Sequence, residues 1–296
     1  MATQITISVP RPAPFFAPIF VAIDKGFFAA EGIDASPRFQ ASVEQLMRRE
    51  VDFAFGSAVY NSMVDSTPAT LICGHSTRET SHVLMVRPGI ESVDRLEHVL
   101  LPGDSGPRGE RFVSELRNIL RANGVDLDEA EISTQNVPGS HKEQWQMLRE
   151  GIGDAATLGA PWFFFAAKQG YTNAGHEPDY SPGVTGSSIY AHPDRVARDP
   201  SLMQAFVRAY VRSMRYCQQN VPGTLETMMK FSREWGVTDQ EIAQAAYDDV
   251  SPYWKLEIDV DALTRMSLQV SEKRGLPPID INRSLDLSFL TQALPA

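Results

Sequence analysis

Sequence patterns for several kinds of functional site are missing from this chain. The spacings HxxxH, HExxH and CxxC, which would place metal ligands together, do not occur, and neither does the GxSxG elbow of serine hydrolases. We therefore expect neither a metal site nor a serine nucleophile, and no cofactor. Cysteine is scarce: Cys73 and Cys217 are predicted to be two buried thiols, with a disulfide or a nucleophilic cysteine as the alternatives.

Positive charge and long apolar runs are also scarce. The 296 residues carry 27 Lys and Arg against 37 Asp and Glu, a net charge of -10, and the basic residues form no cluster. Nucleic acid and anionic membranes are therefore not expected as partners. No apolar run reaches the roughly 18 residues that a membrane helix needs, so no membrane insertion is expected. No secretory leader is visible, which predicts a cytoplasmic protein, or a periplasmic one whose leader was removed.

The stretch from Ala13 to Asp34 is the most informative part of the chain. It follows a short alternating strand, Ile5–Val9, and a proline-rich turn at 10–14. Apolar residues then recur at helical spacing from residue 19 to 28, and Gly32 can adopt the left-handed conformation that ends a helix. A strand, a tight loop and a helix in this order place the loop at the carboxyl edge of an α/β sheet, where such folds bind ligands.

Strands and helices alternate from there to about residue 162, which predicts doubly wound, mostly parallel sheets. A second α/β unit begins near residue 99, and residues 48–58 resemble residues 148–160. Each of these stretches is a helix end, an Asp, a short apolar strand and a loop of small residues. The repeat indicates two similarly built lobes whose ligand edges face each other. The residues after a return crossover at 183–191 are predicted to form helices that brace the first lobe.

Four segments resemble those of type II periplasmic-binding-protein folds. They are Phe20–Asp34 (FVAIDKGFFAAEGID), Glu50–Gly56 (EVDFAFG), Pro88–Leu96 (PGIESVDRL) and Gly153–Pro161 (GDAATLGAP). They occur in the order found in that family. The resemblance is to the branch that contains nitrate-, alkanesulfonate- and taurine-type solute-binding proteins and the thiamine-pyrimidine precursor synthases.

This resemblance implies a two-lobe α/β clamp that holds a ligand between its lobes. Lobe 1 would comprise residues 1–87 and 187–296, lobe 2 residues 88–186, with hinge crossovers near 86–91 and 184–188. The same fold also carries enzymes, among them a sulfinate desulfinase, dihydroxyphthalate-type decarboxylases and chorismate dehydratase. The cysteine-rich motif of the pyrimidine synthase and the cysteine nucleophile of the desulfinase have no visible counterpart here, which argues against those two chemistries.

The strongest local signal for ligand binding is the run Gly103–Gly109 (GDSGPRG) before a helix. Small residues let backbone N–H groups approach an anion, and Arg108 could clamp a carboxylate or sulfonate; the alternative is a capped helix with a surface arginine. Phe15 and Phe16 could form an aromatic wall of the site, with core packing as the alternative. In full, the ligand-binding candidates are Phe15, Phe16, Ser57, Tyr60, His75, Ser105, Arg108, Ser140, Trp162 and Thr185.

Two histidines are the acid–base candidates if the protein is an enzyme. His75 follows an apolar strand and could protonate a carbanion or donate a hydrogen bond, with a structural histidine as the other interpretation. His141 follows a Pro-Gly-Ser loop and would face the cleft from the other lobe. The remaining histidines are predicted to be structural or exposed: His82, His98, His176 and His192.

The sequence leaves two main functions open. The first is the reversible capture of a small organic anion, a carboxylate or sulfonate with an aromatic body as one option, with an ABC permease as partner if the chain is exported. The alternative is a cytosolic, cofactor-free decarboxylase or lyase of an aromatic or unsaturated acid. The absent leader favours the enzyme, and the lack of a second coherent catalytic group favours the binding protein. A cytosolic sensor that binds a metabolite without chemistry is a third interpretation.

Overall fold

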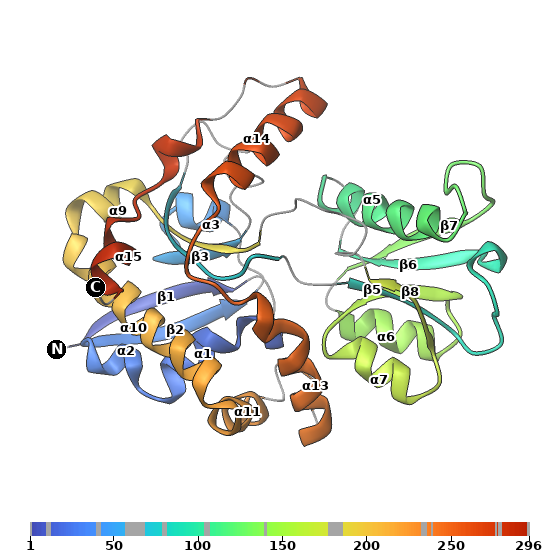
Figure 1. Cartoon of the computed structure of the whole chain (residues 1–296), viewed down its shortest axis with the longest axis horizontal. Helices are drawn as coiled ribbons and strands as arrows, with labels where there is room; N and C mark the ends of the chain where they lie inside the picture. Colours follow the sequence, from blue (N-terminus) through green and yellow to red (C-terminus); the bar gives the residue numbers. More distant parts are fainter. Residues whose placement is uncertain are drawn as a thin grey trace. The chain divides into compact units, whose positions relative to one another are not determined.

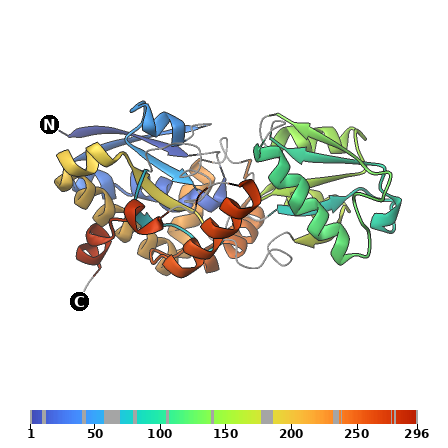
Figure 2. The same ribbon diagram turned by 90° about the horizontal axis from the view of Figure 1, so that it is seen from above.

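The chain divides into two compact units. Unit 1 comprises Met1–Glu79, Gly183–Glu234 and Tyr247–Ala296, and unit 2 comprises Thr80–Pro182 and Trp235–Ala246. Both ends of the chain belong to unit 1 (Figure 2). The computed structural model describes residues 2–9, 13–39, 43–56, 69–78, 82–103, 107–138, 141–176, 186–231, 236–237, 239–275, 277 and 280–294.

Unit 1 is built on a five-stranded sheet with the order β2-β1-β3-β10-β4. β1 runs parallel to β2 and β3, whereas β10 runs antiparallel to both β3 and β4. β1, β3 and β4 therefore end at the same edge of the sheet, which is where open α/β sheets bind ligands. The strands are β1 (Thr3–Val9), β2 (Ile33–Phe39), β3 (Phe53–Gly56), β4 (Thr70–Gly74) and β10 (Ser188–Ala191).

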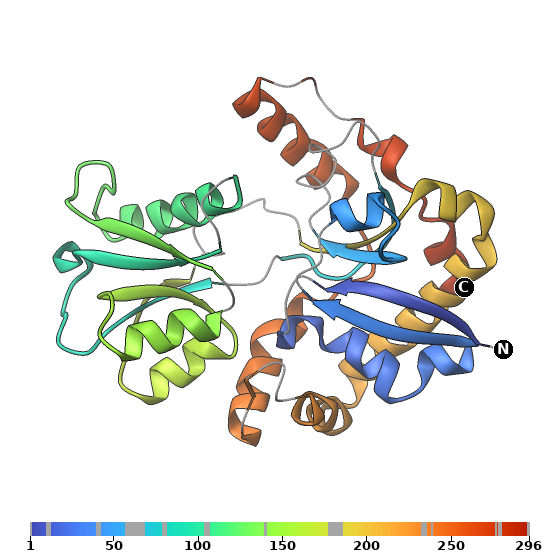
Figure 3. The same cartoon turned by 180° about the vertical axis from the view of Figure 1, so that it is seen from behind.

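Side chains of β3 alternate between two layers of helices, as expected for a strand buried on both faces. Phe53 points to one layer, where its ring stacks on that of Phe206 at a centroid distance of 3.8 Å. Ala54 points to the other layer and packs with Leu46 and Leu263. Figures 1 and 3 show the two layers from opposite sides. The helices are α1 (Ala17–Asp24), α2 (Phe27–Ala30), α3 (Val43–Met47), α9 (Pro193–Arg198), α10 (Pro200–Gln219), α11 (Val221–Lys230), α14 (Val260–Arg274) and α15 (Ser288–Ala293), with the 3₁₀ helices η1 (Pro14–Phe16), η3 (Ser251–Tyr253) and η4 (Ile281–Ser284).

The first predicted helix is two helices in the structure, α1 and α2. Gly26 separates them because it adopts φ 72°, a left-handed conformation that side chains disfavour. Gly32 has the same φ and precedes β2, as predicted. Gly26, between the two helices, and Gly32, after them, are therefore required by their positive φ angles.

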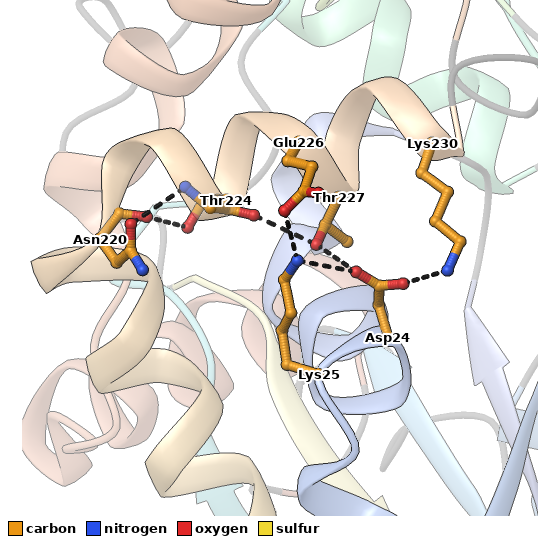
Figure 4. A network of polar contacts seen from close by, with 8 residues as sticks. Asp24, Lys25, Asn220, Thr224, Glu226, Thr227 and Lys230 are labelled. Carbon is orange, nitrogen blue, oxygen red and sulfur yellow. Dashed lines mark hydrogen bonds and ion pairs between the residues drawn. The ribbon is translucent and has the colours of Figure 1, made fainter.

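Charged residues of the same segment tie α1 and α2 to later helices of unit 1. The Asp24 carboxylate accepts hydrogen bonds from Thr227, at 2.8 Å, and from Lys230, both on α11 (Figure 4). Burial would raise the pKa of Asp24, but the hydrogen bonds from Lys230, Thr227 and Lys25 outweigh it and lower that pKa. Glu31 is bound in the same way by two arginines of α10, Arg208 and Arg212.

Unit 2 repeats this plan on a second five-stranded sheet with the order β7-β6-β8-β5-β9. β6 runs parallel to β7 and β8, and β5 runs antiparallel to β8 and β9. Helix α5 covers one face of the sheet, and α6 and α7 cover the other (Figure 1). The elements are β5 (His82–Val86), η2 (Val93–Arg95), β6 (His98–Pro102), α5 (Pro107–Ala122), β7 (Ser133–Val137), α6 (His141–Arg149), β8 (Ala155–Gly159), α7 (Trp162–Lys168) and β9 (Thr172–His176), while α13 (Gln240–Val250) is divided between the units.

The predicted α/β class with two doubly wound, mostly parallel sheets is confirmed, because each sheet has a single reversed strand among its five described strands. The division between the units differs from the predicted one. It falls at 79/80 rather than 87/88, because β5 pairs with β8 and β9 of the second sheet. Residues 235–246 also group with unit 2 rather than with lobe 1. The hinge positions stay a prediction.

Helix α10, with 20 residues, is the longest of the described helices. Charged residues recur along it, and none of the helices in the described ranges has the length and apolar character that a membrane span requires.

Candidate functional site

In unit 1, the described residues at the carboxyl edge of the sheet include Ala13–Phe16, after β1, and His75–Arg78, after β4. The carbonyl oxygen of Phe15 joins these segments. It accepts a hydrogen bond from His75 Nε2 at 3.0 Å and another from Trp254 Nε1 at 2.9 Å. Three stretches that are distant in sequence therefore meet at one backbone atom.

The tautomer of His75 follows from its partners. The Phe15 carbonyl can only accept, so Nε2 carries the proton, and Nδ1 then accepts a hydrogen bond from the hydroxyl of Tyr210. The ring has no exposed surface, and burial lowers the pKa of His75 to about 3, despite the opposing effect of its bond to Phe15. His75 is therefore a neutral side chain with both nitrogens engaged, which fits the structural interpretation that the sequence left open.

Phe15 and Phe16 lie beneath this edge instead of lining it. Each is 3% exposed. The ring of Phe15 meets that of His75 edge-on at 4.7 Å, and the ring of Phe16 stacks on it at 5.5 Å. Their side chains leave little surface for a ligand, so core packing describes them and the predicted aromatic wall is not seen here. Their rings belong to the core that supports His75 at the edge of the unit 1 sheet.

Unit 2 has a second buried polar cluster at the corresponding edge of its own sheet. His82, the first residue of β5, lies 2.9 Å from Glu115 of α5, measured from Nδ1 to Oε2. The ring of His141, the first residue of α6, lies 5.1 Å from that of His82. The three side chains are between 1% and 4% exposed. A carboxylate and two imidazoles therefore share one water-poor space.

His141 has a fixed orientation in this cluster. Its Nδ1 lies 2.7 Å from the amide oxygen of Gln144, so Nδ1 carries a proton. Gln144 in turn donates to the carbonyl of Leu100 at 3.3 Å. A Cβ at Gly159 would come within 2.9 Å of the His141 ring, so a glycine is needed where β8 ends. His141 thus lies at the carboxyl edge of the second sheet, although it is buried.

Trp162, another candidate, is half-buried at the start of α7. Its ring lies 5.6 Å from that of Phe165, and it packs so closely on Gly236 that a Cβ there would overlap the indole. Within unit 2, Trp162 therefore covers a neighbouring segment of its own unit.

The remaining candidates lie outside the residues that the structure describes. These are Ser57, Tyr60, Ser105, Ser140 and Thr185. For Arg108, the backbone belongs to α5, and its side chain is outside the description as well. Their proposed contacts with a ligand stay predictions.

The described groups include neither a cluster of metal ligands nor an ionised thiol. Among the residues with described positions, no three His, Cys, Asp or Glu side chains are arranged to hold a metal ion. Cys73 and Cys217 are buried free thiols, as predicted. Burial raises the pKa of Cys217 to about 12 and that of Cys73 further, so neither thiol is ionised near neutral pH.

Two features of these edges were not found from the sequence. One is the pairing of His82 with Glu115, since a strand residue and a helix residue 33 positions apart give no local signal. The other is Arg78, whose guanidinium lies 4.5 Å over the ring of Tyr253. Arg78 directly follows the polar pair Ser76-Thr77 in the segment that contains His75, and this position is the signal that could have drawn attention to it.

Comparisons with known proteins agree with this architecture. The model of the family described as "NMT1/THI5 like" matches residues 13–222, most of the chain. No curated protein matches the sequence. Several solved structures have the same fold over nearly the whole chain.

One is the alkanesulfonate-binding protein SsuA from Xanthomonas axonopodis pv. citri bound to MOPS, with a TM-score of 0.73, 11% identity, and coverage of 96% of this chain and 98% of that one. The periplasmic nitrate-binding protein NrtA from Synechocystis PCC 6803 has a TM-score of 0.71 and 16% identity, with coverage of 99% of this chain and 88% of that one. A mutant of DszB in complex with biphenyl-2-sulfinic acid has a TM-score of 0.73 and 15% identity, with coverage of 99% of both chains. At these identities the likeness establishes the fold and leaves the ligand open.

Proposed function

Since the chain belongs to the NMT1/THI5-like family, we propose that it is a solute-binding protein that captures a small organic anion, a carboxylate or a sulfonate. The observation that carries this proposal is the fold of both units, which matches proteins described as sulfonate- and nitrate-binding along almost their full lengths. All of these described ligands are anions. The proposal extends that shared chemistry to this chain.

The edges of the two sheets support an anion ligand. In each unit, parallel strands end at one edge, and in unit 2 the nine-residue helix α6 begins there. Backbone N–H groups at such strand ends and helix starts favour negative charge. His75 and His141 are buried and held by hydrogen bonds, as expected for side chains that keep the edge of each sheet rigid and less so for a proton shuttle.

The rival function is a cofactor-free decarboxylase or lyase on the same fold. The observation that favours it is the equal likeness to DszB, whose wild-type form is described as a desulfurization enzyme. In that case His141 is a better proton donor than His75. A proton transfer at His75 would require breaking a buried hydrogen bond to Phe15 or Tyr210, and its pKa of about 3 keeps it neutral.

A role in uptake would require further components. NrtA is described as periplasmic, and one SsuA as part of a sulfonate ABC transporter. By that analogy, this protein would work in the periplasm and deliver its ligand to an ABC permease with its ATPase.

The test is to incubate the full chain with nitrate, methanesulfonate, benzenesulfonate and benzoate, and to record both the melting temperature and the amount of intact compound. A ligand at 100 times its Kd stabilises the folded protein by about 2.7 kcal/mol, which is easily seen as a melting shift. A shift with the compound intact supports the binding protein. Consumption of a compound that is lost in His141→Ala, and retained in the surface variant Glu129→Ala, would instead establish the enzyme. The absence of any shift or turnover would overturn the proposal of an anion ligand.

A further inference from the structure

The chain passes between the two units at four places, 79/80, 182/183, 234/235 and 246/247. The first three of these crossings lie outside the residues that the structure describes. The fourth falls inside helix α13, between Ala246 and Tyr247, where the backbone is helical without interruption from Gln240 to Val250. One continuous helix therefore belongs to unit 2 at its start and to unit 1 at its end.

The residues of α13 make it a stiff helix. Its sequence, QEIAQAAYDDV, contains neither glycine nor proline, at which helices usually kink, and it is rich in alanine and other strong helix formers. In a regular α-helix the N–H groups of residues 247–250 donate to the carbonyls of residues 243–246, so backbone hydrogen bonds span the boundary between the units. Bending the helix at that boundary would break these bonds.

In unit 2, the start of this segment is anchored on helix α7. Gly236 packs so closely on Trp162, the first residue of α7, that a Cβ at this glycine would lie 2.3 Å from the indole ring. Lys168, the last residue of α7, binds the other side of the segment, with its Nζ 2.6 Å from the carboxylate of Glu241 and 3.6 Å from that of Asp239. The segment is therefore held at both ends of α7.

In unit 1, the end of α13 is anchored by Tyr247, which is buried. Its hydroxyl donates to the Cys217 carbonyl of α10 at 2.8 Å, and its ring meets that of Trp254 edge-on at a centroid distance of 5.6 Å. Trp254 in turn donates to the carbonyl of Phe15 at 2.9 Å, at the carboxyl edge of the unit 1 sheet. The anchor in unit 1 is therefore connected to the candidate site through one indole ring.

The two anchors have equivalent places in their units. Trp162 follows β8 and Phe15 follows β1, and both strands end at the carboxyl edge of their own sheet. A displacement of one unit relative to the other must therefore bend α13 or detach it from one of these edges. Bending breaks helical hydrogen bonds, and detachment exposes the Trp162 indole or leaves the hydroxyl of Tyr247 without its buried acceptor.

We propose that α13 is a strut that joins the two units and restricts the motion of one relative to the other, with its anchors at Trp162 and Tyr247. The strut acts whether or not a ligand is bound, so this proposal goes beyond the proposed function and does not depend on it. For a protein that holds a ligand at the edges of its sheets, the strut limits how far those edges can separate.

The experiment measures distances between spin labels on the full chain, without added ligand, by double electron–electron resonance. One label on each unit, at Glu129→Cys and Arg198→Cys, reports the motion between the units, since both positions are exposed. Two pairs inside a single unit are the reference: Glu129→Cys with Gln146→Cys in unit 2, and Arg198→Cys with Glu272→Cys in unit 1. The native thiols are buried and stay unlabelled.

Two changes loosen the helix at the boundary. Inserting two glycines between Ala245 and Ala246 should broaden the distance distribution between the units by up to about 8 Å, the root-mean-square span of a flexible two-residue linker. Ala245→Gly should broaden it less, because it only lowers the helix propensity. The matched control is Ala262→Gly, also at a half-buried alanine but on α14, which lies wholly in unit 1; it should leave the distribution unchanged.

The reference pairs decide how a broadened distribution is interpreted. Broadening between the units with unchanged distributions inside each unit would support the strut. Broadening inside a unit as well would overturn it, since the insertion would then loosen that unit's own packing. An inter-unit distribution that the two-glycine insertion leaves unchanged would also overturn it, because the other crossings would then be sufficient to restrict the motion. Neither result affects the anion-binding proposal, which is tested with ligands.

Discussion

Asp52 and Asp154 occupy the same position in the two units. Asp52 directly precedes β3 and forms a hydrogen-bonded ring with β1, and Asp154 directly precedes β8 and forms one with β6. The Asp52 N–H donates to the Thr6 carbonyl at 2.9 Å, and the Thr6 N–H donates back to the Asp52 carboxylate at 2.8 Å. Asp154 makes the same pair of bonds with His98, at 2.8 and 3.1 Å. The two halves of the chain therefore share a structural device as well as a strand order.

An arginine forms an ion pair with each of these two aspartates. Arg195, which follows β10, lies 3.5 Å from Asp52, and Arg87, which follows β5, lies 2.9 Å from Asp154. β5 and β10 are the reversed strands of their sheets, so the arginine also comes from an equivalent place. These contacts join β1, β3 and β10 in unit 1 and β6, β8 and β5 in unit 2, in each case at the amino edge of the sheet, opposite the candidate site.

We expect Asp154→Ala to destabilise unit 2 by about 1.5–3 kcal/mol, because the carboxylate accepts hydrogen bonds from the N–H groups of both Glu97 and His98. Asp154→Asn should cost less, since its amide oxygen can still accept. Urea unfolding and hydrogen exchange at the His98 amide would measure the effect, with the exposed Glu129→Ala as the control. Wild-type protection at that amide in Asp154→Ala would contradict the assignment.

The neutral His75 predicts a loss of stability in acid. Its folded-state pKa is about 3, well below the ordinary 6.5, so between those values the unfolded chain binds a proton that the folded protein does not. The free energy of unfolding should therefore fall by about 1.4 kcal/mol per pH unit from this group as the pH drops below 6.5. Other groups titrate in the same range, so the comparison is with His75→Gln, measured by urea unfolding at pH 7 and pH 5. The variant should lose less stability over that interval; parallel losses would show that His75 is not held neutral.

The two thiols should be inert in the folded protein. The raised pKa values of Cys73 and Cys217 mean that almost no thiolate is present at pH 8, and burial also blocks access. We expect no reaction with DTNB on a scale of minutes under native conditions and two thiols per chain in urea. A fast-reacting native thiol, located by mass spectrometry, would reopen the possibility of cysteine chemistry.

The Asp24 network should stabilise the packing of α1 on α11. Asp24→Asn is expected to cost about 1.5–3 kcal/mol at pH 7, because a buried carboxylate loses charged hydrogen bonds (Figure 4). The folded-state pKa of Asp24 is lowered, so this contribution is complete above the unfolded value of about 3.9 and is lost as the pH falls through the lower folded value. Chemical unfolding of the wild type and of Asp24→Asn at pH 7 and at pH 3 measures the cost of the substitution and its decrease in acid. Glu226→Gln, at the 73% exposed end of the network, is the control and should cost less than about 1 kcal/mol; equal costs for the two variants would contradict this account.

Local signals in the sequence were sufficient for much of the fold. The apolar alternation of β1 and the helical spacing after residue 17 predict elements that the structure contains. β9 was not predicted, because Thr172–His176 contains neither an alternating pattern nor a strong strand former beyond Thr172. β5 was predicted as a strand but assigned to the wrong lobe, because the pairing partner of a strand is set by tertiary structure and not by its own residues.

The candidate site was less accessible to prediction, for a physical reason. A phenylalanine or histidine at a strand end has the same sequence signature whether its side chain points to solvent or into the core. His75 points inward because its ring is bound to Tyr210, 135 positions away, and the ring of Phe15 packs against that of His75, 60 positions away. No local pattern contains that information.

The bond between Phe15 and Trp254 also constrains how the protein is made. The ribosome synthesises β1 and α1 long before residue 254, so for most of translation the Phe15 carbonyl can accept the hydrogen bond from His75 and not the one from Trp254. Unit 2 needs just residues 80–182 and a short later segment, and its sheet can form while unit 1 is still being synthesised. A nascent chain that stalls before residue 247 would therefore contain the strands of both sheets and lack the last segment of unit 1, which contains Trp254, so it would be a target for chaperones and proteases.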